Sequence, residues 1–157
     1  MNDRYFYRAK RCDTGEWIVG SLIRAPYLGS IRSWISSEQE DKARLREISS
    51  NQAVWRAFEV RTDTICQCTG LKDKNGKLIW ENDIVSFQFD NDDCPFPNKD
   101  TKKRIGKVFF SDFRASWSIT MGKNGSKSLN NDLWKYVQNG NRVEVIGNIF
   151  DNPELLE

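Results

Sequence analysis

The sequence has 157 residues, long enough for one domain, or for one domain with an extension, to bury a hydrophobic core without a metal or a disulfide. Its 24 basic and 22 acidic residues leave a formal charge of +2, too small to attract a polyanion through the overall field. It contains no histidine, the side chain best suited to proton transfer near neutral pH and the commonest nitrogen ligand of metals. Hydrolases and zinc enzymes are therefore disfavoured.

The N-terminus carries charges within its first eight residues and no apolar stretch follows, which predicts that it is not a signal peptide. Apolar runs elsewhere are only a few residues long, too short for a membrane-spanning helix. We expect a soluble protein of the bacterial cytoplasm that makes no contact with a membrane.

The four cysteines, Cys12, Cys66, Cys68 and Cys94, show no framework spacing, so free thiols are expected. Cys66 and Cys68 have the spacing of half a soft-metal site, but such a site needs four ligands and the other cysteines stand alone. The alternative, which we favour, is that both are small residues on one side of a strand. We predict no metal and no cofactor.

The first elements are predicted to be two paired strands. Residues 5–11 and 17–23 are rich in strand-forming side chains, and Gly15 between them can supply the positive φ of a short loop. A hairpin is therefore expected at the start of the chain.

A short helix is predicted next, over residues 38–48. Ser37 and Glu40 have the spacing of a capping box, in which each side chain accepts a hydrogen bond from the other residue's backbone amide. The apolar stripe of this helix is narrow and consists of Ala43, Leu45 and Ile48. Such a helix belongs on the surface or against a partner.

Strand-like composition returns over residues 54–68 and is followed by two turns that define the fold. Asn75 and Gly76 form the strongest short-range hairpin signal, which predicts a primed turn with positive φ at both residues. Asn82 and Asp83 mark a second tight turn.

The strand predicted over residues 84–89 places Val85, Phe87 and Phe89 on one face. Residues 90–103 are polar, contain two prolines and lack periodicity, so they form a long loop that is the best candidate for a functional loop.

Three further strands are predicted, over residues 105–110, 113–121 and 143–150. Residues 122–131 have linker composition, a turn is expected at residues 139–141, and Pro153 ends the last strand because proline has no amide to donate.

The predicted fold class is mainly β with one short α-helix. Residues 1–68 form an N-terminal hairpin, the short helix and a connecting strand; residues 69–157 form a small antiparallel β-barrel of the Src-homology type, and the two together form one compact unit. The predicted barrel core comprises Val85, Phe87, Val108, Phe110, Trp117 and Ile119.

Three segments carry a resemblance to a known family: residues 64–85 (TICQCTGLKDKNGKLIWENDIV), residues 106–108 (GKV) and residues 143–156 (VEVIGNIFDNPELL). The opening FYRAK and GEW motifs at residues 6–10 and 15–17 fit as well. The sequence resembles the YopX family of phage and prophage proteins over nearly its whole length. This resemblance implies a phage- or prophage-encoded, mainly β protein without an established molecular function, and it supplies no catalytic residues.

The sequence departs from the family pattern at the second turn, where Asn82 replaces the usual glycine. Asparagine is the next most tolerant residue for positive φ, so we expect the turn to survive.

One functional hypothesis is binding of nucleic acid, through bases stacked on exposed aromatics beside a basic patch. The candidate patch comprises Lys99, Lys102, Lys103, Arg104 and Lys107. The alternative, which we favour, is that the aromatics form the core and the charge run is a solvated strand edge, because the net charge supplies little attraction for phosphates.

A second hypothesis is an interaction module that binds itself, as a homo-oligomer, or a host or phage protein; a plain monomer is about equally expected. A third is an enzyme that uses Glu81, Asp83 and Asp112, the only plausible catalytic carboxylates near turns. Aspartates before strands are more often turn residues, so no catalytic residue is assigned and no small-molecule substrate is evident. We therefore expect a non-enzymatic accessory protein that acts by binding.

Overall fold

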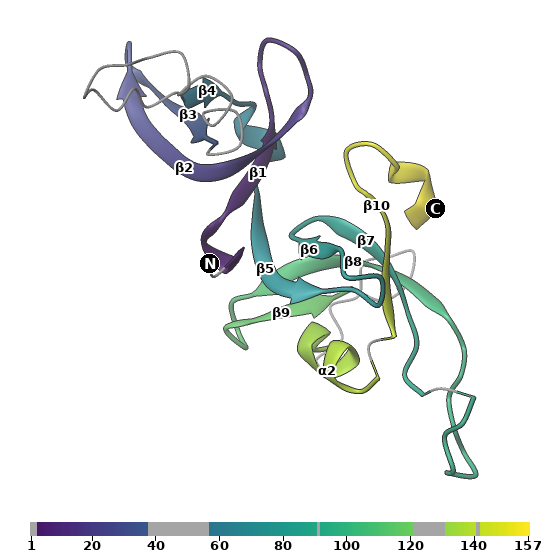
Figure 1. Cartoon of the computed structure of the whole chain (residues 1–157). Coiled ribbons are helices and arrows are strands. Elements are labelled where there is room, and N and C mark those ends of the chain that lie inside the picture. The colour runs from purple at the N-terminus through teal and green to yellow at the C-terminus, as the bar shows by residue number, and fades with distance from the viewer. Residues whose placement is uncertain (1–2, 38–56, 91, 121–130, 141) are drawn as a thin grey trace, which may run out of the picture. The chain divides into compact units, whose positions relative to one another are not determined.

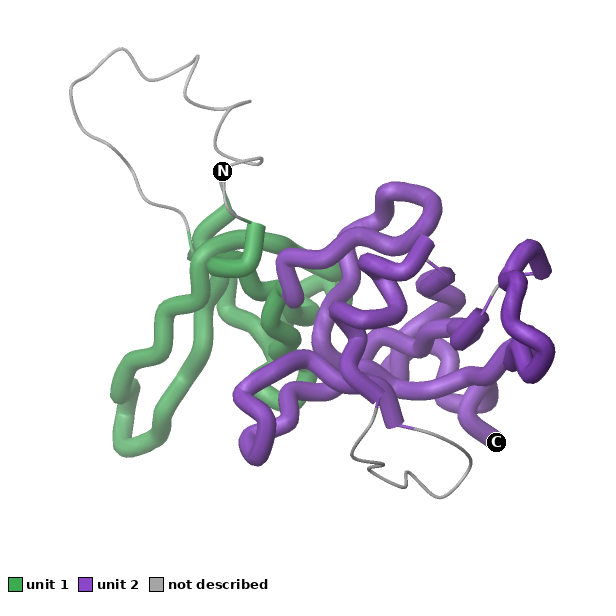
Figure 2. Tube along the Cα trace, turned by 90° about the horizontal axis from the view of Figure 1, so that it is seen from below, with its two compact units in different colours: residues 1–68 green, residues 69–157 purple. Residues whose placement is uncertain are grey.

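A computed structural model describes residues 3–37, 57–90, 92–120, 131–140 and 142–157 of the chain. The chain divides into two compact units, residues 1–68 and residues 69–157 (Figure 2). Each strand pair with a defined register among the described residues is antiparallel, and the predicted mainly β class is confirmed. The helix predicted over residues 38–48 lies outside the described residues.

Unit 1 is built around a curved ladder of antiparallel strands (Figure 1). Its elements are η1 (Asp3–Tyr5), β1 (Tyr7–Lys10), β2 (Trp17–Tyr27), β3 (Ser30–Ser36), β4 (Ala57–Glu59), η2 (Thr62–Thr64) and the start of β5 (Cys66–Lys72). The predicted first hairpin is present as β1 and β2, with Gly15 at φ 74°. Buried apolar side chains gather in one cluster of Ala9, Ile18, Ile35 and Val60.

The second hairpin of unit 1 differs from the prediction. The strand expected over residues 17–23 continues to Tyr27 and pairs with β3, which the sequence did not predict. Leu28 and Gly29 form the two-residue loop between them, with φ 47° and 80°, the positive pair of a type I′ turn. Leucine is unusual there, which is why the turn was missed. We call residues 23–34 the hairpin arm.

Pro26 lies inside β2 and is tolerated there because of its position in the register. Tyr27 is opposite Ser30 across the two-residue loop, so the preceding pair, Pro26 and Ile31, is a non-hydrogen-bonded one. The missing proline amide therefore faces the outer edge of β2, where no ladder bond with β3 is lost.

Unit 2 contains a four-stranded antiparallel sheet with the order β10-β7-β8-β9 (Figure 1). Its elements are the end of β5, β6 (Leu78–Trp80), β7 (Asp83–Phe87), β8 (Arg104–Ser111), β9 (Ser116–Ile119), α2 (Leu133–Gln138), β10 (Val143–Asn148) and η3 (Pro153–Leu156). Among the described residues these strands do not close into a barrel. The helix α2 was not predicted; it begins after Asp132, whose side chain accepts a hydrogen bond from the Trp134 amide at 2.9 Å.

The core of unit 2 is a single cluster of buried side chains: Ile79, Val85, Phe87, Val108, Ile119, Leu133, Tyr136 and Val143. It includes four of the six predicted core residues, and Trp117 packs against it. Phe110 was predicted wrongly: it is 42% exposed and packs edge-on against Trp117, with 5.2 Å between the ring centroids.

Two further aromatic residues lie outside the strands that the alternating pattern assigned to them. The strand predicted from residue 113 begins only at Ser116, because residues 112–115 form a turn in which Ala115 has φ 49°. Phe113 is therefore 86% exposed. Phe89 is also exposed, because β7 ends at Phe87.

The hairpin of β5 and β6 is held by Asp73, a buried residue that the sequence did not single out. Its Oδ1 atom accepts hydrogen bonds from the amides of Asn75 (2.8 Å) and Lys77 (2.9 Å), and its Oδ2 atom accepts one from Val145 (3.0 Å). The Gly76 amide donates to the Asp73 carbonyl, and only Gly76 of the predicted turn pair has a positive φ.

This geometry corrects the turn type. The hairpin tip has a type I turn followed by a left-handed glycine, in place of the predicted primed turn. Asn82, at the second turn, has φ 64°.

Candidate functional site

The outer face of the four-stranded sheet carries a row of polar side chains. The register places Glu144 of β10 opposite Ser86 of β7, and Ser86 opposite Ile105 of β8. Arg142, Gln88 and Lys103 precede or follow these residues by two positions and therefore continue the row on the same face.

These side chains and the hairpin tip line a pocket of about 180 Å³, which we call the cationic pocket. Its lining residues are Lys74, Ser86, Phe87, Gln88, Lys103, Arg142 and Glu144. Lys74 reaches it because its amide donates to the Val143 carbonyl at 2.9 Å, which fixes the β5–β6 hairpin beside β10.

The pocket holds three cations and one carboxylate. The Lys74 ammonium lies 2.6 Å from Glu144 Oε2, and this hydrogen bond is the main reason why the pKa of Glu144 lies below its usual value; the charge of Lys103 lowers it further. Within the described part of the chain Lys103 makes no hydrogen bond or ion pair of its own. Its charge acts on Glu144 through space, while Glu144 itself is paired with Lys74.

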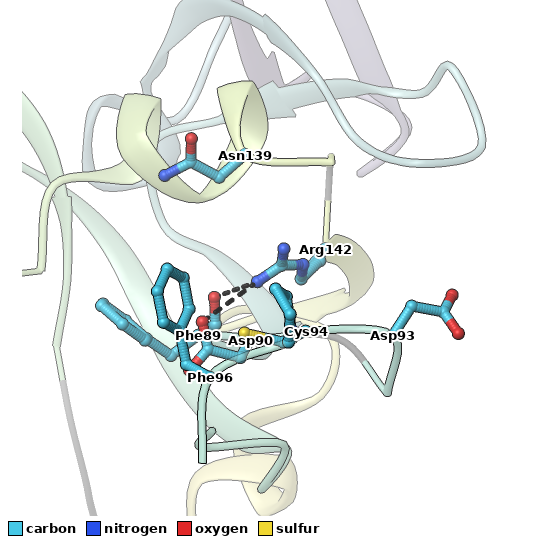
Figure 3. A pocket seen from close by; sticks show the side chains of 8 residues that line it. Phe89, Asp90, Asp93, Cys94, Phe96, Asn139 and Arg142 are labelled. Carbon is cyan, nitrogen blue, oxygen red and sulfur yellow. Dashed lines mark hydrogen bonds and ion pairs between the residues drawn. The ribbon is translucent and has the colours of Figure 1, made fainter. Parts of the chain in front are cut away.

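A second pocket, of about 420 Å³, lies against Arg142 and is called the aromatic pocket (Figure 3). Its lining residues are Phe89, Asp90, Asp93, Cys94, Pro95, Phe96, Asn139 and Arg142. Most of them belong to the long loop before β8, and Asn139 follows α2. Phe96 is 70% exposed and Phe89 43%, so both rings present apolar surface to solvent.

Arg142 is common to both pockets. Its Nη1 atom donates to the Phe89 carbonyl and lies 3.9 Å from Asp90 Oδ1, and Figure 3 shows the guanidinium directed at these two residues. The Nε atom is buried and has no hydrogen-bond partner among the described residues. The Nε–H donor is thus left unsatisfied by the described residues and is also closed off from solvent.

The predicted basic patch is only partly present as a unit. Arg104 pairs with Asp100, which lowers the pKa of Asp100, and the Lys99 ammonium donates to the Asp92 carbonyl. Of the five predicted residues only Lys103 lines either pocket, whereas Lys102 and Lys107 do not. Lys74 and Arg142 were missed because strand pairing, and no local pattern, brings them beside Lys103.

The three carboxylates of the enzyme hypothesis lie at two turns of unit 2. Asp83 is buried at the start of β7, and its Oδ2 atom accepts a hydrogen bond from the Trp80 amide at 2.8 Å. This is the turn role that the sequence favoured. Glu81 is partly buried in the same turn, and Asp112 is exposed in the β8–β9 turn.

Cys66 and Cys68 are both buried on one side of β5. No group of three or more potential metal ligands occurs in the part of the chain that the structure describes. Within the same residues, no helix is long and apolar enough to cross a membrane.

The chain is similar to a solved structure and matches a protein family. The crystal structure of protein EF1440 from Enterococcus faecalis is similar, with a TM-score of 0.50 and 22% sequence identity over 96% of this chain and 96% of that chain, which bears on the fold alone. No curated protein matches the sequence. The family model described as YopX protein matches residues 6–157, and the chain therefore belongs to the YopX family.

Proposed function

We propose that this chain is a non-enzymatic accessory protein, encoded by a phage or prophage and acting in the bacterial cytoplasm, that binds a partner protein through the hairpin arm. The observation that carries the proposal is a set of exposed apolar side chains along the arm. Leu28 is 87% exposed, Ile31 64%, Tyr27 49% and Ile23 45%. Exposed apolar residues that gather on one element mark an interaction surface.

The charge of the arm identifies the chemistry of the partner. Residues 17–37 contain no acidic residue, and the arm carries Arg24 and Arg32. The Arg32 guanidinium lies 4.8 Å from the centre of the Tyr27 ring and pairs with Glu59 at 3.1 Å, whereas Arg24 is exposed. The complementary surface is an apolar groove with carboxylates at its rim.

A different protein fits this chemistry better than the same arm of a second copy, because two identical arms would bring like charges together. Pro26 also removes an amide from the outer edge of β2, which disfavours strand addition there. Side chains, more than backbone, would make the contact.

A photoreactive amino acid in place of Leu28 would identify the partner in host cells, and the purified pair would then be titrated. We expect the double substitution Leu28→Asp and Ile31→Asp to weaken binding at least about tenfold, because it removes two apolar anchors. The matched control is Phe113→Asp in unit 2, since Phe113 is equally exposed at 86%.

Equal binding by both variants would refute the proposal. Light scattering at micromolar concentration tests self-assembly: an oligomer that the arm variant dissociates would make a second copy the partner.

Unit 2 adds two points, one about its form and one about a second candidate function. We infer that the β5–β6 hairpin, anchored to β10 through Asp73, gives unit 2 a barrel-like form of the Src-homology type. The second candidate function, binding of nucleic acid, is favoured by one observation: Lys103, which makes no ion pair among the described residues, lies beside Arg142 in the cationic pocket.

A further inference from the structure

We propose that unit 2 binds a nucleotide, with its phosphate in the cationic pocket and its base in the aromatic pocket. The inference is independent of the hairpin arm, which belongs to unit 1. It rests on Arg142, which lines both pockets, so that a ligand with an anionic group on one side of this residue and a ring on the other contacts both.

The two pockets differ in charge in a way that sets the orientation of the ligand. Arg142 is counted once, with Asp90, which it pairs with. The cationic pocket then has Lys74 and Lys103 against Glu144, which gives 2 − 1 = +1. The aromatic pocket has Arg142 against Asp90 and Asp93, which gives 1 − 2 = −1. A phosphate is therefore attracted to the first pocket and repelled from the second.

The cationic pocket offers donors of the kind that phosphate oxygens require. Lys103 is an ammonium without an ion pair among the described residues, Gln88 lines the same wall, and Arg142 adds positive charge at the boundary of the two pockets. Lys74 is held in place by Glu144, so it contributes a fixed charge.

The aromatic pocket offers what an unpaired base requires. Phe96 and the exposed part of Phe89 offer stacking surface, and the Asn139 amide can hydrogen-bond a base edge. The Lys135 ammonium lies 4.9 Å from the centre of the Phe89 ring and adds positive charge beside this platform. Because a base inside a duplex cannot stack on these rings, the ligand is a free nucleotide or a single-stranded nucleic acid.

The experiment titrates the full chain at low salt with three probes: inorganic phosphate, a nucleoside monophosphate and a fluorescent single-stranded 8-mer, with the duplex of the same sequence for comparison. Lys103→Gln is expected to weaken binding of phosphate, the monophosphate and the single-stranded 8-mer about tenfold each, because it removes one charge-assisted hydrogen bond. Its matched control is Lys102→Gln, an exposed lysine one residue away that lines neither pocket.

Phe96→Ala separates the two halves of the site. It is expected to weaken binding of the nucleotide and the 8-mer several-fold and to leave binding of inorganic phosphate unchanged. Tighter binding of the 8-mer than of the monophosphate identifies nucleic acid as the source of the ligand, and equal binding identifies a free nucleotide; both support the site.

The proposal is overturned if no probe binds at millimolar concentration, if Lys102→Gln and Lys103→Gln have equal effects, or if Phe96→Ala changes nothing. The arm variant with Leu28→Asp and Ile31→Asp is expected to bind every probe like the unchanged protein. Failure of this site and failure of the arm are therefore separate results.

Discussion

Gly76 shows how one backbone angle fixes the tip of the β5–β6 hairpin. It has φ 80°, and a β-carbon at this position would meet no atom within 4 Å. Any penalty of substitution therefore comes from the backbone and not from a clash. Asp73 completes the turn by accepting the amides on either side of Gly76.

We expect Gly76→Val to lower the free energy of unfolding by about 1–2 kcal/mol, because valine is strained at positive φ. Urea denaturation and thermal melting measure the change. Gly76→Asn is the control: asparagine tolerates this region and should lose much less. A melting temperature that valine leaves unchanged would contradict the left-handed geometry.

At the scale of residues, the sequence predicted burial correctly where the local strand pattern sets it. It failed where tertiary contacts set it. The burial of Val85 and Phe87 followed from strand alternation. The exposure of Phe110 and the burial of Asp73 did not, because each depends on which segment packs against it. The meeting of Lys74 and Arg142 likewise depends on strand pairing.

At the scale of elements, strands with a familiar turn signal were predicted and those without one were not. The β1–β2 hairpin was predicted through Gly15, whereas β3 was missed because leucine at position 28 is not typical of a type I′ turn. The helix α2 was missed because Trp134, Tyr136 and Val137 are strand-forming residues. Its existence depends on Asp132 as the cap and on burial of Leu133 and Tyr136 in the core.

The two elements that were not predicted contribute to the candidate surfaces. Strand β3 completes the hairpin arm, and α2 leads to Asn139 in the aromatic pocket. Both candidate surfaces therefore rest on elements where local preference and final structure disagree. Such disagreement is expected at functional positions, where packing or binding overrides propensity.

At the scale of the whole molecule, the absence of histidine governs the response to pH. No side chain with an ordinary pKa titrates between about pH 5.5 and 7.5, so stability should be level there. The carboxylates of Asp13, Asp63, Asp100 and Glu144 have pKa values lowered by hydrogen bonds from Arg11, Arg61, Arg104 and Lys74.

Because these carboxyl pKa values are lower in the folded than in the unfolded state, their stabilisation is complete above the unfolded pKa of about 4 and is lost as pH falls through the folded values. We expect the melting temperature to stay constant from pH 6 to 7.5 and to fall below about pH 4. High salt should flatten the acid decline, since these pairs are solvent-accessible. A titration step between pH 6 and 7 would contradict this account.

Leu28 lies where the chain turns back on itself, at φ 47°, and 87% of its surface faces solvent. A leucine there adds about 1–2 kcal/mol of backbone strain and recovers little by burial. We expect Leu28→Asn to raise the melting temperature by a few degrees and, in the same protein, to weaken binding of the arm's partner. The stability of the fold alone gives no reason for a leucine at this position, and the binding role proposed for the arm supplies one.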